Sequence, residues 1–304
     1  MNFLNLIRWK NLLMIALVQL LIKYALLEPF GAQTSLNSAG IFLLIIATTC
    51  IAAAGNIIND INDIQTDLIN KPDKIIVGHS ISLKTAYNLY IVFTSFGVII
   101  GFLLTKLINQ SSFFILFVVI SALLYVYATQ LKRTFLIGNI VISFLVGSSI
   151  LIVGVFELLP NITALNRATQ IVFFKTIFDY GVFAFALTLL REIAKDIEDI
   201  DGDYNANMNT LPIVIGRARA KHVLSVLNFF PLGAIILYTI LNLYKQPIAV
   251  LYFLLLVIGP FIYISVKTFS AKSKKDFHAI SNLYKLVMLF GMLSLLLYKY
   301  VILN

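Results

Sequence analysis

Nine apolar runs, each near the length of a bilayer crossing, limit what this chain can fold into more than any other feature. They lie at roughly 11–30, 38–58, 86–106, 112–130, 135–158, 168–190, 222–243, 247–266 and 282–302. A helix needs ~20 residues to cross the hydrocarbon core, where only helices and closed barrels satisfy every backbone group. The composition agrees, because 60% of the residues are hydrophobic, 12% are charged and the mean hydropathy is +0.94. We therefore expect an all-α bundle of nine transmembrane helices and exclude a water-soluble globular domain.

An acidic pattern of eight residues, D-I-x-D-I-x-x-D, occurs twice, at 60–67 and again 136 positions later at 196–203. These two acidic motifs and their neighbours hold ten of the 14 acidic residues of the chain. Spacings of three and four residues put the three shared aspartates of each motif on one face of a helix. Carboxylates of this kind hold Mg²⁺ when phosphate oxygens complete its coordination shell. The pattern predicts a magnesium diphosphate site, and the alternative is that each motif is a solvated helix end.

The candidate residues of this site fall into two groups. The predicted metal ligands are Asp60, Asp63, Asp67, Asp196, Asp199 and Asp203, of which Asp63, Asp67, Asp199 and Asp203 are also the candidate catalytic residues. The candidates for binding the diphosphate are Asn56, Asn59, Lys71, Lys74, Lys132 and Arg133. The amides can orient metal ligands, and the cations suit phosphate oxygens. For the four basic residues, the excess of positive charge on cytoplasmic loops is the competing explanation.

Lysine and arginine are distributed unevenly between the two ends of the predicted helices. If the N-terminus is cytoplasmic, the outer connections carry only Lys106, Arg167, Lys245 and Lys299. This bias predicts a multi-pass protein of the cytoplasmic membrane, with the N-terminus and both acidic motifs on the cytoplasmic face. The net charge of +9 follows from the same bias, so no nucleic-acid partner is expected.

The two halves of the sequence match beyond the carboxylates, because a proline and then a glycine follow each acidic motif. These residues are Pro72 and Gly78 after the first motif, and Pro212 and Gly216 after the second. We expect one transmembrane domain, 1–304, made of two four-helix halves, about 1–134 and 135–270, and a ninth helix at about 282–302. The repeat spans an even number of crossings, which gives the halves parallel topology. The two motifs should then face each other across a central cavity.

The motifs and the loops after them resemble those of the UbiA superfamily of intramembrane prenyltransferases, over nearly the whole chain. The first signature, N-D-x-x-D-x-x-x-D with an N-[KR]-P-x-[KR]-x-[IV]-x-x-G-x-[IV]-S loop, is met by 59–67 and 70–82. The second, D-x-x-D-x-x-x-D leading to T-L-P and a glycine, is met within 196–216. The segment 127–134 is similar to the basic loop after the fourth helix of the family.

This resemblance implies a nine-helix bundle in which both acidic motifs hold Mg²⁺, or Mn²⁺, on a polyprenyl diphosphate. It also implies that the isoprenoid chain lies in a groove open to membrane lipid and is transferred to a lipid or aromatic acceptor. Within the superfamily, 191–203 is most similar to digeranylgeranylglyceryl phosphate synthases, which alkylate the hydroxyl of geranylgeranylglyceryl phosphate. The expected reaction is therefore Mg²⁺-dependent transfer of a geranylgeranyl group to that hydroxyl.

Two other functions stay open at this point. Prenyltransferases with aromatic acceptors, in quinone or chlorophyll-type biosynthesis, share the outer motifs, so the resemblance does not fix the acceptor. A transporter or lipid-binding membrane protein would also have parallel repeats and intramembrane charges. Carriers place polar sites near the midplane, whereas these carboxylates cluster at the cytoplasmic ends of the second and sixth runs, which favours an enzyme. The oligomeric state is open.

Four further ionisable residues have no part in this scheme. Lys175 and Asp179, four residues apart in the sixth run, predict a local helix ion pair facing the bundle rather than a substrate site. Lys23 is expected to extend to the outer interface. His79 is expected to be a surface-loop residue rather than a catalytic base.

Overall fold

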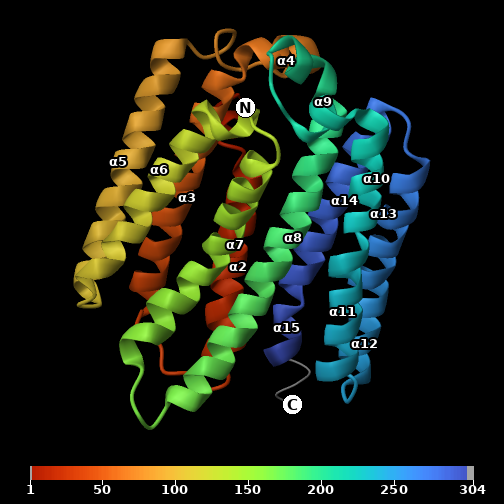
Figure 1. Ribbon diagram of the computed structural model, residues 1–304. Helices are drawn as coiled ribbons and strands as arrows, with labels where there is room; N and C mark the ends of the chain where they lie inside the picture. Colours follow the sequence, from red (N-terminus) through yellow and green to blue (C-terminus); the bar gives the residue numbers. More distant parts are fainter. Residues whose placement is uncertain (1, 300–304) are drawn as a thin grey trace.

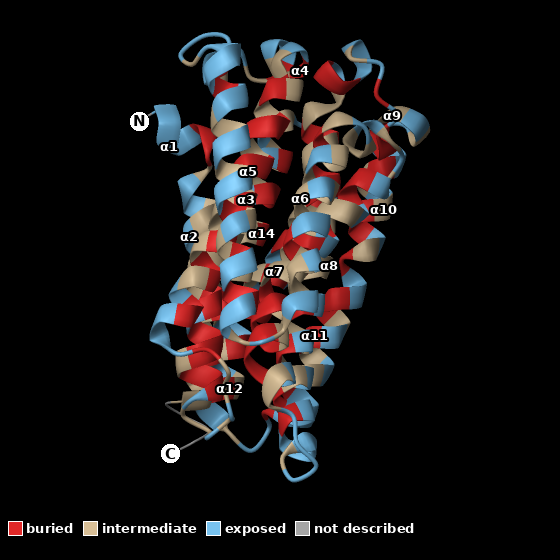
Figure 2. Cartoon of the chain, turned by 90° about the vertical axis from the view of Figure 1, so that its left-hand side faces the viewer, coloured by how far each residue is buried: buried red, intermediate tan, exposed pale blue. Residues whose placement is uncertain are grey.

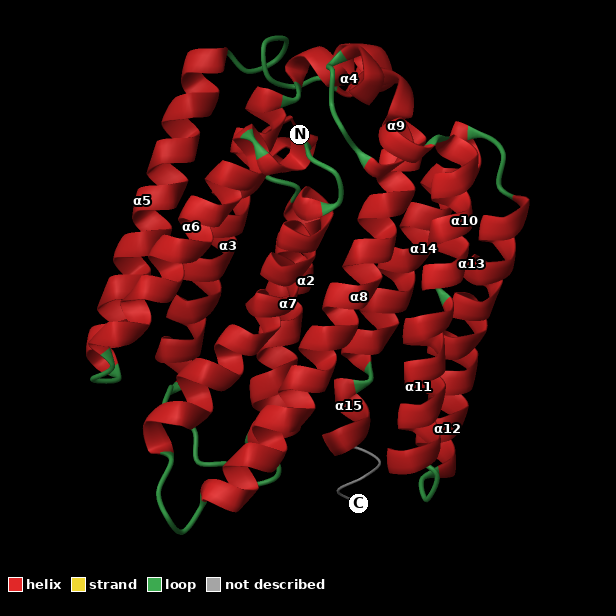
Figure 3. Cartoon of the chain, in the orientation of Figure 1, coloured by secondary structure: helices red, strands yellow, loops and turns green. Residues whose placement is uncertain are grey.

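A computed structural model describes residues 2–299 of the chain, and 300–302 of the predicted ninth helix lie outside the described part. Within 2–299, nine helices are long and apolar enough to cross a membrane, and no strand is present. They stand side by side as a bundle, with the N-terminus at one end (Figure 1; Figure 3). The prediction of an all-α membrane bundle is confirmed, and the chain is an integral, multi-pass membrane protein.

Several spans are interrupted, so the helices number more than the crossings. The α-helices are α1 (Asn2–Leu6), α2 (Trp9–Leu21), α3 (Ser38–Asn62), α4 (Ile64–Asn70), α5 (Leu83–Leu107), α6 (Phe114–Thr129), α7 (Ile137–Leu158), α8 (Arg167–Asn205), α9 (Leu211–Ile215), α10 (Arg217–Leu227), α11 (Phe229–Asn242), α12 (Pro247–Tyr252), α13 (Gly259–Ser270), α14 (Lys274–Leu293) and α15 (Leu295–Leu297). The π-helices are η1 (Ile22–Leu27) and η6 (Phe253–Ile258), and the 3₁₀ turns are η2 (Pro72–Lys74), η3 (Ser111–Phe113), η4 (Leu131–Arg133) and η5 (Leu159–Asn161). The short helices α4 and α9 lie at the N-terminal end of the bundle (Figure 1).

Polar side chains at helix starts explain where several spans begin. Asn37 accepts the N–H of Gly40 at 2.8 Å ahead of α3, and the hydroxyl of Ser82 accepts the N–H of Thr85 at 3.1 Å ahead of α5. A capping box formed by Ser273 and Asp276 starts α14. Such caps satisfy backbone donors that have no partner within the helix. The capping box starts the last span well before the predicted residue 282, in a polar stretch that hydropathy does not reveal.

The two acidic motifs differ in their backbone. The sixth apolar run ends near 190, but α8 continues to Asn205 and carries the whole second motif on one helix. In the first motif α3 ends at Asn62, α4 begins at Ile64, and Asp63 lies at the break between them. Asparagine and aspartate compete for backbone groups, and the Asn62 amide donates to the Ile58 carbonyl at 2.8 Å. The prediction of three aspartates on one helix is therefore wrong for the first motif.

Large apolar side chains cover the outside of the bundle. On α5, Ile91, Phe96 and Leu103 are all exposed, and Figure 2 shows an outward face of this helix that is largely exposed along its length. A surface this apolar is unfavourable in water and suits contact with lipid chains. Buried residues form separate clusters, one around α2, α3 and α7, and another among α8 and the helices that follow it.

A buried ion pair holds the end of the bundle opposite the acidic motifs. Lys23 Nζ donates to Glu157 Oε1 at 2.8 Å and also to the Leu36 carbonyl, while Glu157 Oε2 accepts the Leu36 N–H at 3.0 Å. The side chains of Lys23 and Glu157 are 1% and 0% exposed. The expectation that Lys23 extends to the interface is therefore wrong, because α7 supplies a buried partner for its charge.

The predicted ion pair between Lys175 and Asp179 is also wrong. No ion pair joins the two side chains among the described residues, and Lys175 is exposed on α8. A lysine placed four residues before the acid is the less favourable order on a helix, because both charges then oppose the helix dipole.

Candidate active site

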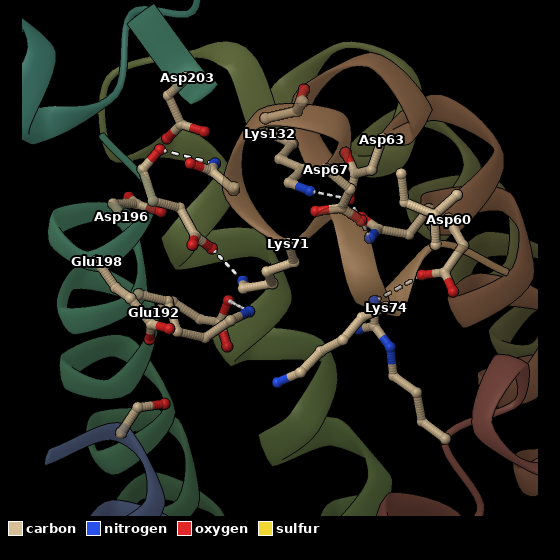
Figure 4. A pocket seen from close by; sticks show the side chains of 18 of the residues that line it. Asp60, Asp63, Asp67, Lys71, Lys74, Lys132, Glu192, Asp196, Glu198 and Asp203 are labelled. Carbon is tan, nitrogen blue, oxygen red and sulfur yellow. Dashed lines mark hydrogen bonds and ion pairs between the residues drawn. The ribbon is translucent and has the colours of Figure 1, made fainter. Parts of the chain in front are cut away.

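A polar cavity of about 880 Å³ lies at the N-terminal end of the bundle (Figure 4). Its wall contains the six aspartates of the two motifs: Asp60, Asp63, Asp67, Asp196, Asp199 and Asp203. Asp60 comes from α3, Asp63 from the break after it and Asp67 from α4. The last three come from α8, against which α4 packs. Figure 4 shows the two sets on opposite sides of the cavity, with the lysines between them. The fold thus brings both motifs to one cavity.

Each aspartate of the first motif has a different environment. Asp60 accepts from Arg8 Nη2 at 2.8 Å. Asp63 Oδ2 accepts from the Asn59 amide at 2.6 Å and forms an ion pair with Lys132. Burial of Lys132 disfavours its charge, but the Asp63 carboxylate outweighs this and raises the pKa of Lys132. Burial raises the pKa of Asp67, and the negative charge of Asp63 adds to that shift.

The second motif is held by donors from three other elements. The Asn139 amide on α7 donates to Asp196 Oδ2 at 2.7 Å. Lys71, from the loop after α4, donates to Asp199 Oδ2 at 2.6 Å. The hydroxyl of Thr210 donates to Asp203 Oδ2 at 3.4 Å. Within 2–299, Asp199 Oδ1 is buried without any hydrogen-bond partner, so one carboxylate oxygen of this set is left available in the cavity wall.

Four of the six predicted diphosphate-binding residues line the cavity and two do not. Those in the wall are Asn59, Lys71, Lys74 and Lys132. Asn56 instead donates to the Ile7 carbonyl at 3.0 Å, which is one of the carbonyls left unpaired at the end of α1. Arg133 follows Lys132 in a 3₁₀ turn, where successive side chains point about 120° apart, and it lies outside the wall. His79 is an exposed residue at the cavity.

Asn70 joins the two motifs in a way that the sequence alone did not reveal. Its amide donates to the Asp199 carbonyl at 2.9 Å, and its carbonyl oxygen accepts the Gly202 N–H at 3.0 Å. A Cβ on Gly202 would lie 2.3 Å from Asn70 Nδ2, so this contact requires glycine. The only sequence signals are an asparagine after the first motif and a glycine inside the second, and spacing does not show that they meet.

The polar cavity adjoins an apolar pocket of about 170 Å³ deeper in the bundle. Apolar side chains from four helices line this pocket, among them Met14 and Val18 on α2, Ile150 on α7, Phe183 and Leu187 on α8, and Met288 on α14. Asn11, Arg191 and Lys285 line both spaces and mark the junction. A molecule with an anionic head and an apolar chain fits this change of polarity.

Comparison with known proteins identifies the family. The UbiA prenyltransferase family model matches residues 20–300. The chain belongs to this family. It is therefore an enzyme of the prenyltransferase class, as the resemblance of its two acidic motifs implied.

Curated relatives of this UbiA-family enzyme include two archaeal proteins named digeranylgeranylglyceryl phosphate synthase. The protein of Methanosphaera stadtmanae is 30% identical over 96% of this chain and 97% of its own. The protein of Methanococcoides burtonii is 32% identical over 96% of this chain and 98% of its own.

Solved structures show the same fold. A digeranylgeranylglyceryl phosphate synthase aligns with a TM-score of 0.61 and 26% identity over 97% of this chain and 98% of that one. A UbiA homologue from Aeropyrum pernix aligns with a TM-score of 0.67 and 15% identity over 90% and 94% of the two chains. A homologue from Archaeoglobus fulgidus, bound to DMAPP and Mg²⁺, aligns with a TM-score of 0.56 and 18% identity over 97% and 99%.

Proposed function

We propose that this UbiA-family enzyme transfers a geranylgeranyl group from its diphosphate to the hydroxyl of geranylgeranylglyceryl phosphate. The observation that carries the proposal is the polar cavity, lined by both acidic motifs and continuous with an apolar pocket. The curated relatives support the choice of acceptor, because proteins named digeranylgeranylglyceryl phosphate synthase match over almost the whole chain. The bias of basic residues supports a cytoplasmic orientation of the cavity.

We infer that the acidic motifs hold Mg²⁺ together with the diphosphate. The donor set fits this ion, because it consists of hard carboxylate oxygens and includes the unpaired Asp199 Oδ1. The principal ligands would be Asp63, Asp67, Asp199 and Asp203. The further ligands would be Asp60 and Asp196. Among the described residues no three such side chains gather tightly enough to hold a metal alone, so phosphate oxygens must supply part of the coordination. Mg²⁺ supplies positive charge that stabilises the diphosphate as it leaves.

Lys71 and Lys132 are the chain's own cations at the diphosphate. Each comes from a loop and crosses the cavity to a carboxylate, Lys71 to Asp199 and Lys132 to Asp63. Both ammonium groups therefore lie between the two sets of aspartates, where an incoming diphosphate meets them. Their positive charge stabilises the negative charge that develops as the carbon–oxygen bond of the allylic diphosphate breaks. Lys74 lines the same cavity and adds to this charge.

The apolar pocket suits the isoprenoid part of a substrate. An allylic cation formed beside it must be protected from water until the acceptor oxygen attacks. The junction of polar cavity and apolar pocket gives that protection, because Phe183, Leu187 and Met288 replace water along one side. The acceptor hydroxyl forms the new ether bond, and the diphosphate departs to the polar cavity.

The test is a prenyl-transfer assay on the purified protein with Mg²⁺ and labelled geranylgeranyl diphosphate. The acceptors are geranylgeranylglyceryl phosphate, geranylgeranylglycerol and 4-hydroxybenzoate, and mass spectrometry identifies the products. We expect the ether of the glyceryl phosphate to form fastest. Faster prenylation of the aromatic acid would replace the ether-lipid assignment with an aromatic one. Absence of any prenylated product would contradict a transferase that uses geranylgeranyl diphosphate with these acceptors.

A further inference from the structure

Besides Lys74, three basic side chains in the cavity wall form no ion pair with an aspartate of the acidic motifs. Arg191 and Lys195 lie on α8, and Lys285 lies on α14, which packs against α8. We call these three residues the basic cluster. Arg8, Lys71 and Lys132 are different, because each pairs with an aspartate of a motif.

The basic cluster carries more positive charge than its surroundings neutralise. Glu192 serves two members at once, accepting from Arg191 Nη1 at 2.6 Å and from Lys195 Nζ at 2.9 Å. Within 2–299, Lys285 has no hydrogen bond or ion pair, and the buried Nε of Arg191 has no hydrogen-bond partner. Lys285 lines the same cavity wall as Arg191, Lys195 and Glu192.

Such an arrangement is unfavourable for the protein alone. Like charges in a partly dehydrated site repel one another more strongly than they do in water. A bound anion removes that repulsion and supplies acceptors for donors that lack a partner. Arginine and lysine are the side chains that proteins use for phosphate groups. The basic cluster therefore has the charge and the unused donors of a phosphate site.

The position of the cluster defines the rest of the ligand. Arg191 and Lys285 lie at the junction with the apolar pocket, so an anion bound there has apolar walls next to it. Arg191 lies about 12 Å along α8 from Asp199, from the rise per residue of a helix. This separation leaves room for a diphosphate at the acidic motifs and a second anion at the cluster. An amphiphile with an anionic head fits this position.

We propose that Arg191, Lys195 and Lys285 form a second anion site, which binds the phosphate monoester of the acceptor lipid. The proposal rests on the proposed function, since it assigns the acceptor as a glyceryl phosphate. Lys132 and Arg133, which the sequence marks as candidates for binding the diphosphate, do not belong to this second site. Lys132 pairs with Asp63 instead, and Arg133 lies outside the cavity wall. Glu192 positions two members of the cluster, Arg191 and Lys195.

The test compares Lys285→Met, Lys285→Arg and the control Lys275→Met, an exposed lysine on the same helix. For Lys285→Met we expect KM for geranylgeranylglyceryl phosphate to rise at least tenfold, and KM for prenyl diphosphate to stay within twofold. KM for geranylgeranylglycerol, which lacks the phosphate, should not change. Lys285→Arg should restore the acceptor KM to within threefold of wild type, and Lys275→Met should match wild type.

A thermal-unfolding measurement separates binding from folding. Because the cluster repels itself, Lys285→Met should raise the melting temperature of the protein without substrate. An unchanged acceptor KM overturns the proposal. So does an equal rise for geranylgeranylglycerol, or an effect on prenyl diphosphate alone.

The anion site can be tested even if the proposed function fails. If the wild type prenylates no glyceryl phosphate, the proposed function is wrong, and binding of sn-glycerol 1-phosphate is then measured by thermal shift. Stabilisation of wild type that is lost in Lys285→Met supports the anion site on its own. Equal shifts in both proteins, or no shift in either, overturn it.

Discussion

At the scale of single residues, the cavity is organised by lysines that cross between the two acidic motifs. Asp63 and Asp199 each form an ion pair with a lysine from a different connection between helices. Asp199 nevertheless keeps one buried oxygen without a partner. These two aspartates therefore combine structural pairing with the capacity to bind a further cation.

Replacing either aspartate should remove activity without unfolding the protein. We expect Asp63→Ala and Asp199→Ala each to lower kcat/KM by more than tenfold, about 1.4 kcal/mol of barrier, because each removes a ligand from one side of the site. Asp201→Ala is the matched control, since Asp201 is exposed on α8 and outside the cavity wall. Steady-state kinetics measure the effect, and activity above a tenth of wild type in either aspartate variant would count against the ligand role.

Removal of the metal gives a second prediction for the same residues. Hard oxygen ligands favour Mg²⁺ and Mn²⁺, so EDTA should abolish turnover, and either ion added in excess should restore it. The measurement is the initial rate of labelled product with and without chelator. Full activity in EDTA would exclude a metal-dependent step.

At the scale of elements, the site depends on a contact between α4 and α8. Asn70 ends α4 and bonds the backbone of α8 beside Gly202, which fixes the distance between the first motif and the second. The break at Asp63 makes this contact necessary, because α4 is no longer a rigid continuation of α3. The Asn70 side-chain amide thus joins the continuous helix α8 to α4, which follows the break after α3.

A side chain at position 202 should separate these elements. Gly202→Ala places a Cβ 2.3 Å from Asn70 Nδ2, so we expect a loss of ~1–3 kcal/mol in stability and reduced turnover. A double-mutant cycle checks the cause, since Gly202→Ala should cost clearly less in an Asn70→Ala background. Gly233→Ala is the control, because nothing lies within 4 Å of its added Cβ. Additive effects at 70 and 202 would show that the contact does not matter.

At the scale of the whole molecule, the two ends of the bundle have opposite roles. One end contains the large polar cavity, and the other is closed by Lys23, Glu157 and the Leu36 backbone. This pairing ties the first span, the loop before α3 and the end of α7 together. The two side chains are fully buried, so the Glu157 carboxylate depends on Lys23, which also lies 3.5 Å from the partly exposed Glu28 carboxylate.

Breaking the buried pair should destabilise the bundle far from the site. We expect Lys23→Met alone to cost ~3–5 kcal/mol, because the buried Glu157 carboxylate then lacks its partner. Glu157→Gln should cost less, because Lys23 Nζ keeps Glu28 Oε1 at 3.5 Å. The double variant Lys23→Met with Glu157→Met should recover much of that loss. Thermal unfolding in detergent measures all three, and equal destabilisation in the single and double variants would contradict the reasoning.

Much of the fold was predictable because hydropathy is summed over about twenty residues and tolerates local irregularity. Single side-chain contacts were less predictable. Lys23 resembled an interfacial lysine, because the residues near it in the sequence do not indicate that it pairs with the distant Glu157. The glycines after the motifs were visible as a pattern, and Gly78 and Gly216 do share a left-handed backbone, with φ of 86° and 88°. Lys285 was the missed signal, because a charge inside an apolar run is expensive unless it has a use.

The repeat of two parallel halves stays a prediction. The site does not require the two halves to have the same backbone structure. The acidic motifs reach the cavity by different backbones, so they contribute unequal geometry. The second motif lies on one continuous helix, whereas the first is interrupted at Asp63. Sequence spacing shows that the residues repeat but does not show that the two backbones differ.

The closed end of the bundle, opposite the polar cavity, has a consequence for the membrane around it. A membrane enzyme that admits water, metal ions and phosphates from one side risks becoming a leak for protons across a bilayer that stores an electrical potential. Here Val18 and Ile150 line the apolar pocket and belong to the buried cluster that also contains Ile22, Val153 and Phe156. Each ion that approaches from the cavity therefore faces a dry barrier. The bundle can handle highly charged substrates and remain an electrical insulator.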